Sequence, residues 1–152
     1  MISASTTEDN YLFSLATGYH VGEDFRGIKL VDSTNKMLAM CGFDYWAPNA
    51  AQIHIWLPVR LGLRSKSFFK ELFKYIFVSS DKGVVIGCIP ESNPACIKFT
   101  QGMGFKEIFR IKDGWDIGQD MVVNEMRREN CKWIDEEYRK PNEHIRNTAG
   151  PV

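Results

Sequence analysis

The sequence predicts one α/β domain of the α+β type, in which helices flank a mixed, mostly antiparallel sheet. Two observations support this prediction. A chain of 152 residues is long enough for one ordinary domain and too short for two with a linker. Along it, runs with the two-residue period of strands alternate with runs that have the 3.6-residue period of helices. We therefore treat residues 1–152 as one domain.

The first third of the chain predicts a short helix and an antiparallel meander. Residues 11–19 favour a helix of about two turns. The β-prone runs 25–31 and 37–45 are joined by the turn-forming residues 32–36, so they predict a hairpin. A third strand is predicted at 52–57 and completes the meander.

The middle of the chain predicts a helix, a buried strand and a second helix. Residues 65–80 place aromatic and aliphatic side chains on one helical face and three lysines with Glu71 on the other. Residues 83–89 are apolar and almost uncharged, as in a strand covered on both faces. Asn93 followed by Pro94 is a typical helix start, and one of the two glycines in the later Gly-Met-Gly run ends that helix.

The last part of the chain predicts two closing strands and a final helix. The strands are expected at 105–111 and 121–126, and a polar amphipathic helix at about 128–139. We expect residues 136–152 to form a flexible tail.

Composition narrows the classes of partner. Acidic and basic residues balance at 19 each, so we expect no nucleic-acid partner. No run reaches the length of a membrane span, and the N-terminus lacks the pattern of a secretion signal, so we expect a cytoplasmic protein without a membrane partner. The four cysteines lie far apart with no histidine at zinc-ligand spacing, which predicts reduced thiols and no metal.

The segment between strand 52–57 and helix 65–80 has the features of an anion site. It contains a glycine and the cations Arg60, Arg64 and Lys66, and it leads into a helix N-terminus. Free main-chain N–H groups and the helix dipole converge at such a point, so a pyrophosphate would fit there. The alternative is a basic loop that only confers solubility.

Residues 93–105 resemble the second signature of the GNAT N-acetyltransferase superfamily. The matching positions are Asn93, Phe99, Gly104 and Phe105, with Cys96 in the place of a small residue. The order of predicted elements is also similar, so the resemblance covers roughly residues 25–133. Its C-terminal part is similar to the protein N-terminal acetyltransferase branch and to bacteriophage-encoded members, through residues 118–120, Met126 and 128–133.

The resemblance implies a GNAT-like sheet that is splayed between its central strands, 52–57 and 83–89. Acetyl-CoA would lie in the splay as co-substrate, and an amine would attack its thioester directly. Main-chain amides near Leu57 and Val59 would hold the thioester carbonyl. The cofactor-binding positions that the resemblance implies are Leu57, Val59, Arg60, Gly62, Leu63, Arg64, Ser65, Lys66, Asn93 and Phe99.

Two residues are candidates for the chemistry. His54 titrates near neutrality and shares a strand face with Trp56, so it is the candidate base, with Asp44 and Glu91 as reserves. The alternative is a histidine hydrogen-bonded within the sheet. Thr100 occupies the place of the usual tyrosine acid, where its hydroxyl either stabilises the leaving thiolate or caps a buried turn.

The sequence leaves the acceptor open between a protein amine and a small amine, and a homodimer also stays open. Trp115 lies in a turn between the last two strands, where an exposed aromatic would contact a partner. The cofactor loop departs from the usual pattern and the tyrosine is missing. A catalytically weak or inactive GNAT-fold protein that acts through protein contacts is therefore the alternative function. In a bacteriophage-encoded protein, the location would be the host cytoplasm.

Overall fold

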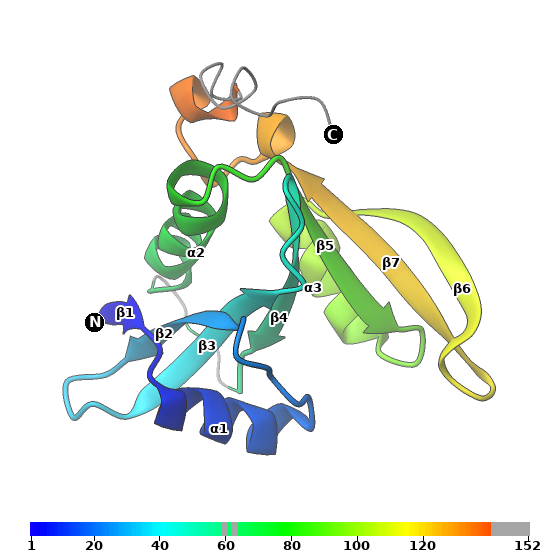
Figure 1. The fold of residues 1–152 in the computed structure, drawn as a ribbon, viewed down its shortest axis with the longest axis horizontal. Coiled ribbons are helices and arrows are strands. Elements are labelled where there is room, and N and C mark those ends of the chain that lie inside the picture. Colours follow the sequence, from blue (N-terminus) through cyan, green and yellow to red (C-terminus); the bar gives the residue numbers. More distant parts are fainter. Residues whose placement is uncertain (59–60, 62–63, 141–152) are drawn as a thin grey trace.

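A computed structural model describes residues 1–58, 61 and 64–140 of the protein. In this part of the chain one sheet holds seven strands in the order β1-β2-β3-β4-β5-β7-β6 (Figure 1). The strands are β1 (Ile2–Ala4), β2 (Arg26–Val31), β3 (Met37–Asp44), β4 (Ala50–Trp56), β5 (Val84–Pro90), β6 (Lys106–Asp116) and β7 (Gln119–Arg127). The α-helices are α1 (Thr7–Thr17), α2 (Arg64–Lys74) and α3 (Pro94–Met103).

The sheet is antiparallel except at its centre, where β4 and β5 run parallel. Three residue pairs join these two strands: Ala50–Val84, Ala51–Val85 and Gln52–Ile86. Beyond them, β4 stays paired with β3 as far as Trp56, and β5 stays paired with β7 as far as Pro90. The sheet therefore forks into two halves, whose diverging strands are visible in Figure 1. The predicted mostly antiparallel sheet, splayed between its central strands, is confirmed.

The two faces of the sheet carry different cores. The face that packs on α2 and α3 holds the larger core, whose α2 contribution is Phe68, Phe69, Leu72 and Phe73. The opposite face packs on α1 through a smaller cluster of Phe13, Phe25 and Met40. Because side chains alternate along a strand, Ile53 of β4 belongs to the first core while Trp56 packs against the second.

The helix ends follow from local sequence. The Thr6 hydroxyl accepts a hydrogen bond from the Asp9 N–H at 3.2 Å, and Asp9 accepts one from the Thr6 N–H at 2.7 Å, which forms a capping box for α1. Asn93 caps α3 by accepting from the Cys96 N–H at 3.1 Å. Gly104 ends α3 with φ 113°, a left-handed conformation that favours glycine. The predicted start and end of this helix are confirmed.

The predicted helix at 128–139 is wrong. Two 3₁₀ turns, Arg128–Asn130 and Glu136–Arg139, lie there instead. The side chain of Arg128 is buried, and its guanidinium pairs with Asp81 at 2.5 Å and donates to a carbonyl of the second turn. These tertiary contacts fix an irregular path that overrides the helical pattern of the sequence. Residues 136–140 thus belong to described structure, whereas 141–152 of the expected tail lie outside the described residues.

Two further elements differ from expectation. The sequence did not predict β1, a strand of three residues that pairs with β2 at the sheet edge. The α-helical part of the helix expected over 65–80 ends at Lys74, and the chain continues as a π-helix, Tyr75–Ser79.

Candidate functional site

The fork between β4 and β5 is the candidate functional site. Past Gln52 the described ladder between the two strands ends, so residues 53–56 turn one main-chain edge toward β5 without pairing to it. At the apex, a Cβ added to Gly87 would lie 3.7 Å from Cγ2 of Ile53, so the space between β5 and this side chain would hold one methyl group. Unpaired main-chain N–H groups along such an edge are suited to bind a carbonyl oxygen of a ligand.

His54 lies in the forked part of β4, on the face covered by α1. Its Nε2 lies 2.7 Å from Oδ1 of Asp44, and its side chain is only 12% exposed. The ring stacks on that of Tyr19, with centroids 3.9 Å apart. Burial lowers the pKa of His54 below its ordinary value, although the Asp44 carboxylate opposes this shift. His54 is therefore neutral at pH 7, the protonation state that a base requires.

Asp44 also binds Tyr19. The Tyr19 hydroxyl donates to Oδ2 of Asp44 at 2.8 Å, and the Asp44 side chain is 4% exposed. Burial, together with the nearby Asp44, raises the pKa of Tyr19 well above its ordinary value, so the phenol stays protonated. Sequence reasoning named Asp44 only as a reserve and missed Tyr19. The one available signal was an acidic residue at the end of an otherwise apolar strand.

The expected cofactor loop is only partly described. Val59, Arg60, Gly62 and Leu63 lie outside the described residues, as does the side chain of Arg64. Leu57 is half-buried and packs against the larger core. Ser65 and Lys66 lie in the first turn of α2, at the helix N-terminus. The positive end of the helix dipole lies there and attracts anions.

The three expected residues near α3 differ in exposure. Asn93 is exposed, and because its Oδ1 accepts from the helix, its Nδ2 remains as a donor. Phe99 is 39% exposed and its ring contacts that of Phe69 at 6.0 Å. Thr100 is buried, and its hydroxyl donates to the carbonyl of Ile97 at 3.0 Å. The structure thus shows the turn-capping arrangement for Thr100.

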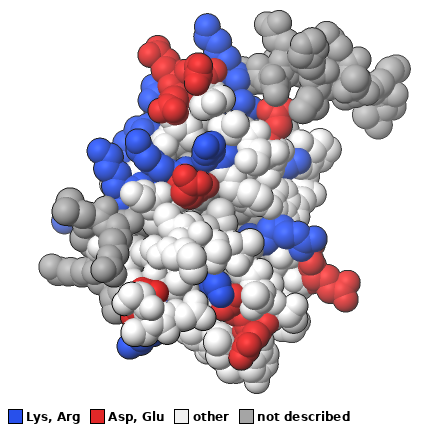
Figure 2. Space-filling view, turned by 90° about the vertical axis from the view of Figure 1, so that its left-hand side faces the viewer, with Lys and Arg blue, Asp and Glu red and all other residues white. Residues whose placement is uncertain are grey.

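Lysines line the outer face of α2. Lys66, Lys70 and Lys74 are spaced four residues apart and are exposed. Figure 2 shows basic side chains gathered at the height of this helix. Glu71, also exposed, lies next to Lys70 and Lys74, so this face keeps a net positive charge that, together with the helix N-terminus, attracts phosphates.

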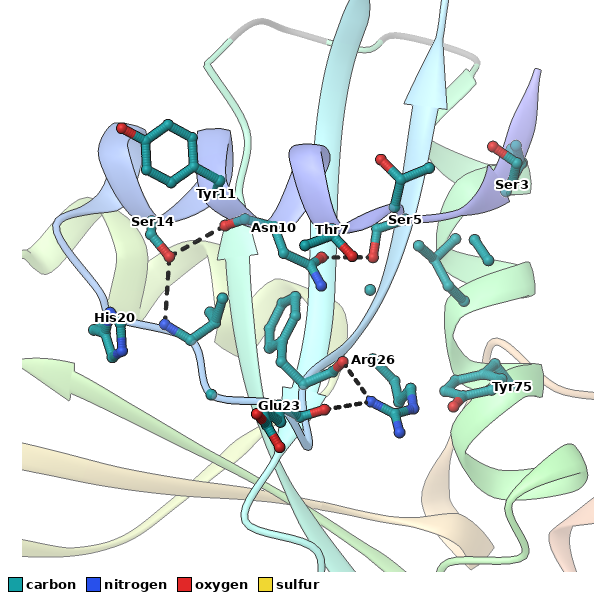
Figure 3. A pocket seen from close by; sticks show the side chains of 18 of the residues that line it. Ser3, Ser5, Thr7, Asn10, Tyr11, Ser14, His20, Glu23, Arg26 and Tyr75 are labelled. Carbon is teal, nitrogen blue, oxygen red and sulfur yellow. Dashed lines mark hydrogen bonds between the residues drawn. The ribbon is translucent and has the colours of Figure 1, made fainter.

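A separate groove lies at the outer edge of the sheet, between α1, β1 and β2 on one side and the end of α2 on the other. Its volume is about 1330 Å³. Hydroxyl and amide groups such as Ser5, Asn10 and Ser14 face Arg26 and Tyr75 across it (Figure 3). It contains none of the residues predicted for the site. The groove and the fork are therefore two different places on the molecule.

The residues that the structure describes contain no group of acidic, histidine or cysteine side chains able to hold a metal ion. No helix among them has the length and hydropathy to cross a membrane.

A sheet that forks at a central parallel pair, with a helix after each forked strand, has the architecture of GNAT N-acetyltransferases. Solved structures of the spermidine N-acetyltransferase SpeG from Vibrio cholerae share it. The structure in complex with CoA and spermine has a TM-score of 0.69 at 11% identity, covering 86% of this chain and 96% of that chain. A mutant form of the same enzyme has a TM-score of 0.71 at 12% identity, covering 90% and 99%.

These similarities establish the GNAT fold for the chain, as the sequence resemblance implied. Another SpeG structure, in complex with manganese ions, has a TM-score of 0.68 at 12% identity, with coverage of 84% and 91%. No protein-family profile and no curated protein sequence matches the chain.

Proposed function

We propose that the chain is an acetyl-CoA-dependent N-acetyltransferase, with residues 1–152 forming one acyltransferase domain. The observation that carries the proposal is the fork, where β4 leaves β5 after three residue pairs while keeping its pairing with β3. His54 lies two residues beyond the last of these pairs. A polyamine N-acetyltransferase of the same fold has been solved with CoA bound, which supports the proposal.

In the proposed reaction, an uncharged primary amine attacks the thioester carbonyl carbon directly. A C–N bond forms and the C–S bond breaks, so no covalent enzyme intermediate arises. The amine nitrogen gives one proton to His54, and the CoA sulfur leaves as a thiolate that takes a proton from water. Free main-chain amides of β4 would stabilise the oxyanion that develops on the carbonyl oxygen. A neutral histidine suits the role of base.

Two parts of acetyl-CoA would be bound in different ways, its pyrophosphate as an anion and its pantetheine arm through its amide groups. Its pyrophosphate would lie at the N-terminus of α2, near Arg60, Arg64 and Lys66, with Gly62, Leu63 and Ser65 contributing main-chain groups. The thioester carbonyl would meet amides near Leu57 and Val59. Asn93 Nδ2 would donate to the pantetheine arm, and the exposed face of Phe99 would pack along it.

The acceptor is proposed to be a primary amine. SpeG acts on spermidine, which favours a small amine here, whereas the motif at 118–120 and 128–133 favours a protein amine, as in the N-terminal acetyltransferase branch and its bacteriophage members. Trp115, 49% exposed in the β6–β7 hairpin, would contact a protein acceptor. A cytoplasmic location belongs to the same proposal.

The test combines calorimetry with a thiol-release assay. We expect acetyl-CoA to bind at micromolar concentrations and thiol release to depend on added amine. Spermidine and a peptide with a free N-terminus serve as the two acceptors. Trp115→Ala should reduce turnover of the peptide and not of spermidine.

The two histidines among the described residues, His54 and His20, allow a matched comparison of two alanine variants. His54→Ala should lower kcat/KM by about 10²–10⁴, the usual contribution of a general base. His20→Ala removes an exposed histidine outside the fork and should leave turnover unchanged. Equal activity of both variants and wild type would exclude His54 as the base.

One observation favours a second candidate, a GNAT-fold protein that acts through protein contacts with little catalysis. The hydroxyl of Thr100 is buried and already donates to Ile97, so it offers no acid to the leaving sulfur. Absence of acetyl-CoA binding in calorimetry would support this candidate and overturn the enzyme.

A further inference from the structure

Three side chains from three segments meet on the α1 face of the sheet next to the fork. Asp44 comes from the end of β3, His54 from β4, and Tyr19 from the segment after α1. Asp44 uses both carboxylate oxygens: Oδ1 lies 2.7 Å from Nε2 of His54, and Oδ2 accepts from the Tyr19 hydroxyl at 2.8 Å. The Tyr19 ring lies flat on the imidazole, with an interplanar angle of 22°. Each member thus contacts both others.

The packing around these groups leaves the imidazole little freedom. Phe25 is 2% exposed and its ring centroid lies 6.3 Å from that of His54. Phe13 supports Phe25 from α1 at 5.3 Å. His54 is therefore held by a hydrogen bond at one nitrogen, by a stacked ring on one face, and by the apolar ring of Phe25 beside it.

The hydrogen bonds also fix which nitrogen carries the proton. A carboxylate only accepts hydrogen bonds, so Nε2 of neutral His54 must be the N–H donor to Asp44. The lone pair of the neutral ring then lies on Nδ1, which is the atom able to take a proton. Without Asp44 the two tautomers of a neutral imidazole would both be populated, and part of the protein would present an N–H where a lone pair is needed.

The charges that act on His54 come from this group. Among the described residues, Asp44 is the acidic group that contacts it, and Tyr19 is the other titratable group in contact. Tyr45, which is exposed, interacts with the Tyr19 hydroxyl and contributes to its raised pKa. From α1 and from the residue before β2, the neighbouring side chains Phe13 and Phe25 carry no charge.

We propose that Tyr19 and Asp44 are positioning residues for acyl transfer, which hold His54 in the tautomer with a free Nδ1 and thereby aim it as the base. This inference rests on the proposed N-acetyltransferase function and adds to it the residues that act through His54. Tyr19 holds the carboxylate with its hydroxyl and the imidazole with its ring, so it sets the orientation of both.

The experiment measures the pKa of His54 by NMR titration in Asp44→Asn and Tyr19→Phe. Asp44→Asn removes a charge 2.7 Å from Nε2 and should lower the pKa of His54, by about 1–3 units for a close opposite charge. Tyr19→Phe keeps the stacked ring and removes a donor that partly neutralises the carboxylate, so the pKa of His54 should rise.

Turnover at high pH, where His54 is neutral in every variant, measures orientation separately from titration. Asp44→Asn should lose most of the base contribution, about 10²–10⁴ in kcat/KM, and Tyr19→Phe should lose a smaller part. Tyr11→Phe removes an exposed hydroxyl from α1 and is the matched control with wild-type values. Thermal melting of each variant shows that it is folded, and Tyr19→Phe keeps the test valid if Asp44→Asn does not fold.

The outcomes separate the two proposals. Opposite pKa shifts combined with losses of turnover support the inference. If wild type acetylates amines while both variants keep its turnover, or if the pKa of His54 does not respond, the positioning role is overturned and the proposed function stands. If wild type releases no thiol with any amine, the proposed function fails, and the catalytic role of the group fails with it even where the NMR shifts have the expected signs.

Discussion

Gly42→Ala should destabilise the protein because the position has no room for a side chain. Gly42 lies on β3 opposite His54, and a Cβ there would lie 2.2 Å from Cζ of Phe25. Two further atoms of the same ring would lie at 2.7 and 2.8 Å, so a rotation of the ring cannot relieve the clash. Phe25 is 2% exposed and backed by Phe13, so it has to move into packed space.

The expected cost is that of an overpacked core, about 1–3 kcal/mol in the free energy of unfolding. For a chain of this length, each kcal/mol lowers Tm by about 2–4 °C. Calorimetry or thermal melting followed by circular dichroism measures this shift. Since Phe25 also walls the ring of His54, amine acetylation should fall along with stability.

A control variant and a compensating double variant test the steric origin of this loss. Gly102→Ala is the same substitution in α3, where a Cβ would meet no atom within 4 Å, so Tm should rise because alanine favours a helix by about 0.5–1 kcal/mol. Phe25→Leu combined with Gly42→Ala should recover part of the lost stability. A Gly42→Ala protein that melts at or above the wild-type temperature would refute the argument.

Three further predictions concern pH, the helix cap and the C-terminal turns. Burial lowers the pKa of His54, so kcat/KM should rise with pH along a limb whose midpoint lies below the ordinary histidine value of about 6.5, and a midpoint above 7 would contradict this. Asn93→Ala removes the cap of α3, so it should lower the free energy of unfolding by about 1 kcal/mol and raise the KM for acetyl-CoA. Asn93→Asp keeps the cap and should change only the KM. Thermal melting and steady-state kinetics measure the two effects. Arg128→Met should lower the free energy of unfolding, measured by urea denaturation, by about 1–3 kcal/mol because Asp81 loses its partner. Asp81→Asn added to the same chain should restore part of this loss. Additive losses from the two substitutions would count against the pairing.

Much of the fold was predictable because local patterns and tertiary packing agree. The aromatic face of the helix that begins at Arg64, the uncharged strand β5 and the Asn93 cap each carry their own signal, and the structure confirms all three. The fork itself could be inferred only from the resemblance of 93–105 to a known superfamily. No periodicity in β4 or β5 indicates where their pairing stops.

The remaining elements depend on contacts between distant residues. Arg128 has a helical pattern around it, but its pairing with Asp81 and the hydrogen bond from Trp133 to the carbonyl of Met103 at 2.8 Å determine the local path. Tyr19 follows a weak helical segment, and nothing in that segment indicates a partner on β3. Of the expected site, the roles of His54 and the cofactor loop stay predictions.

The parallel seam between β4 and β5 has a consequence for how the molecule opens and closes. The seam joins the two halves of the sheet through only three residue pairs, whereas the neighbouring pairings β3–β4 and β5–β7 contain five and seven. A pairing with so few hydrogen bonds opens at a lower free energy than the rest of the sheet. Deuterium should therefore enter the amides of the seam before those of either half, and a molecule wedged between the two strands would bridge the halves and slow that exchange.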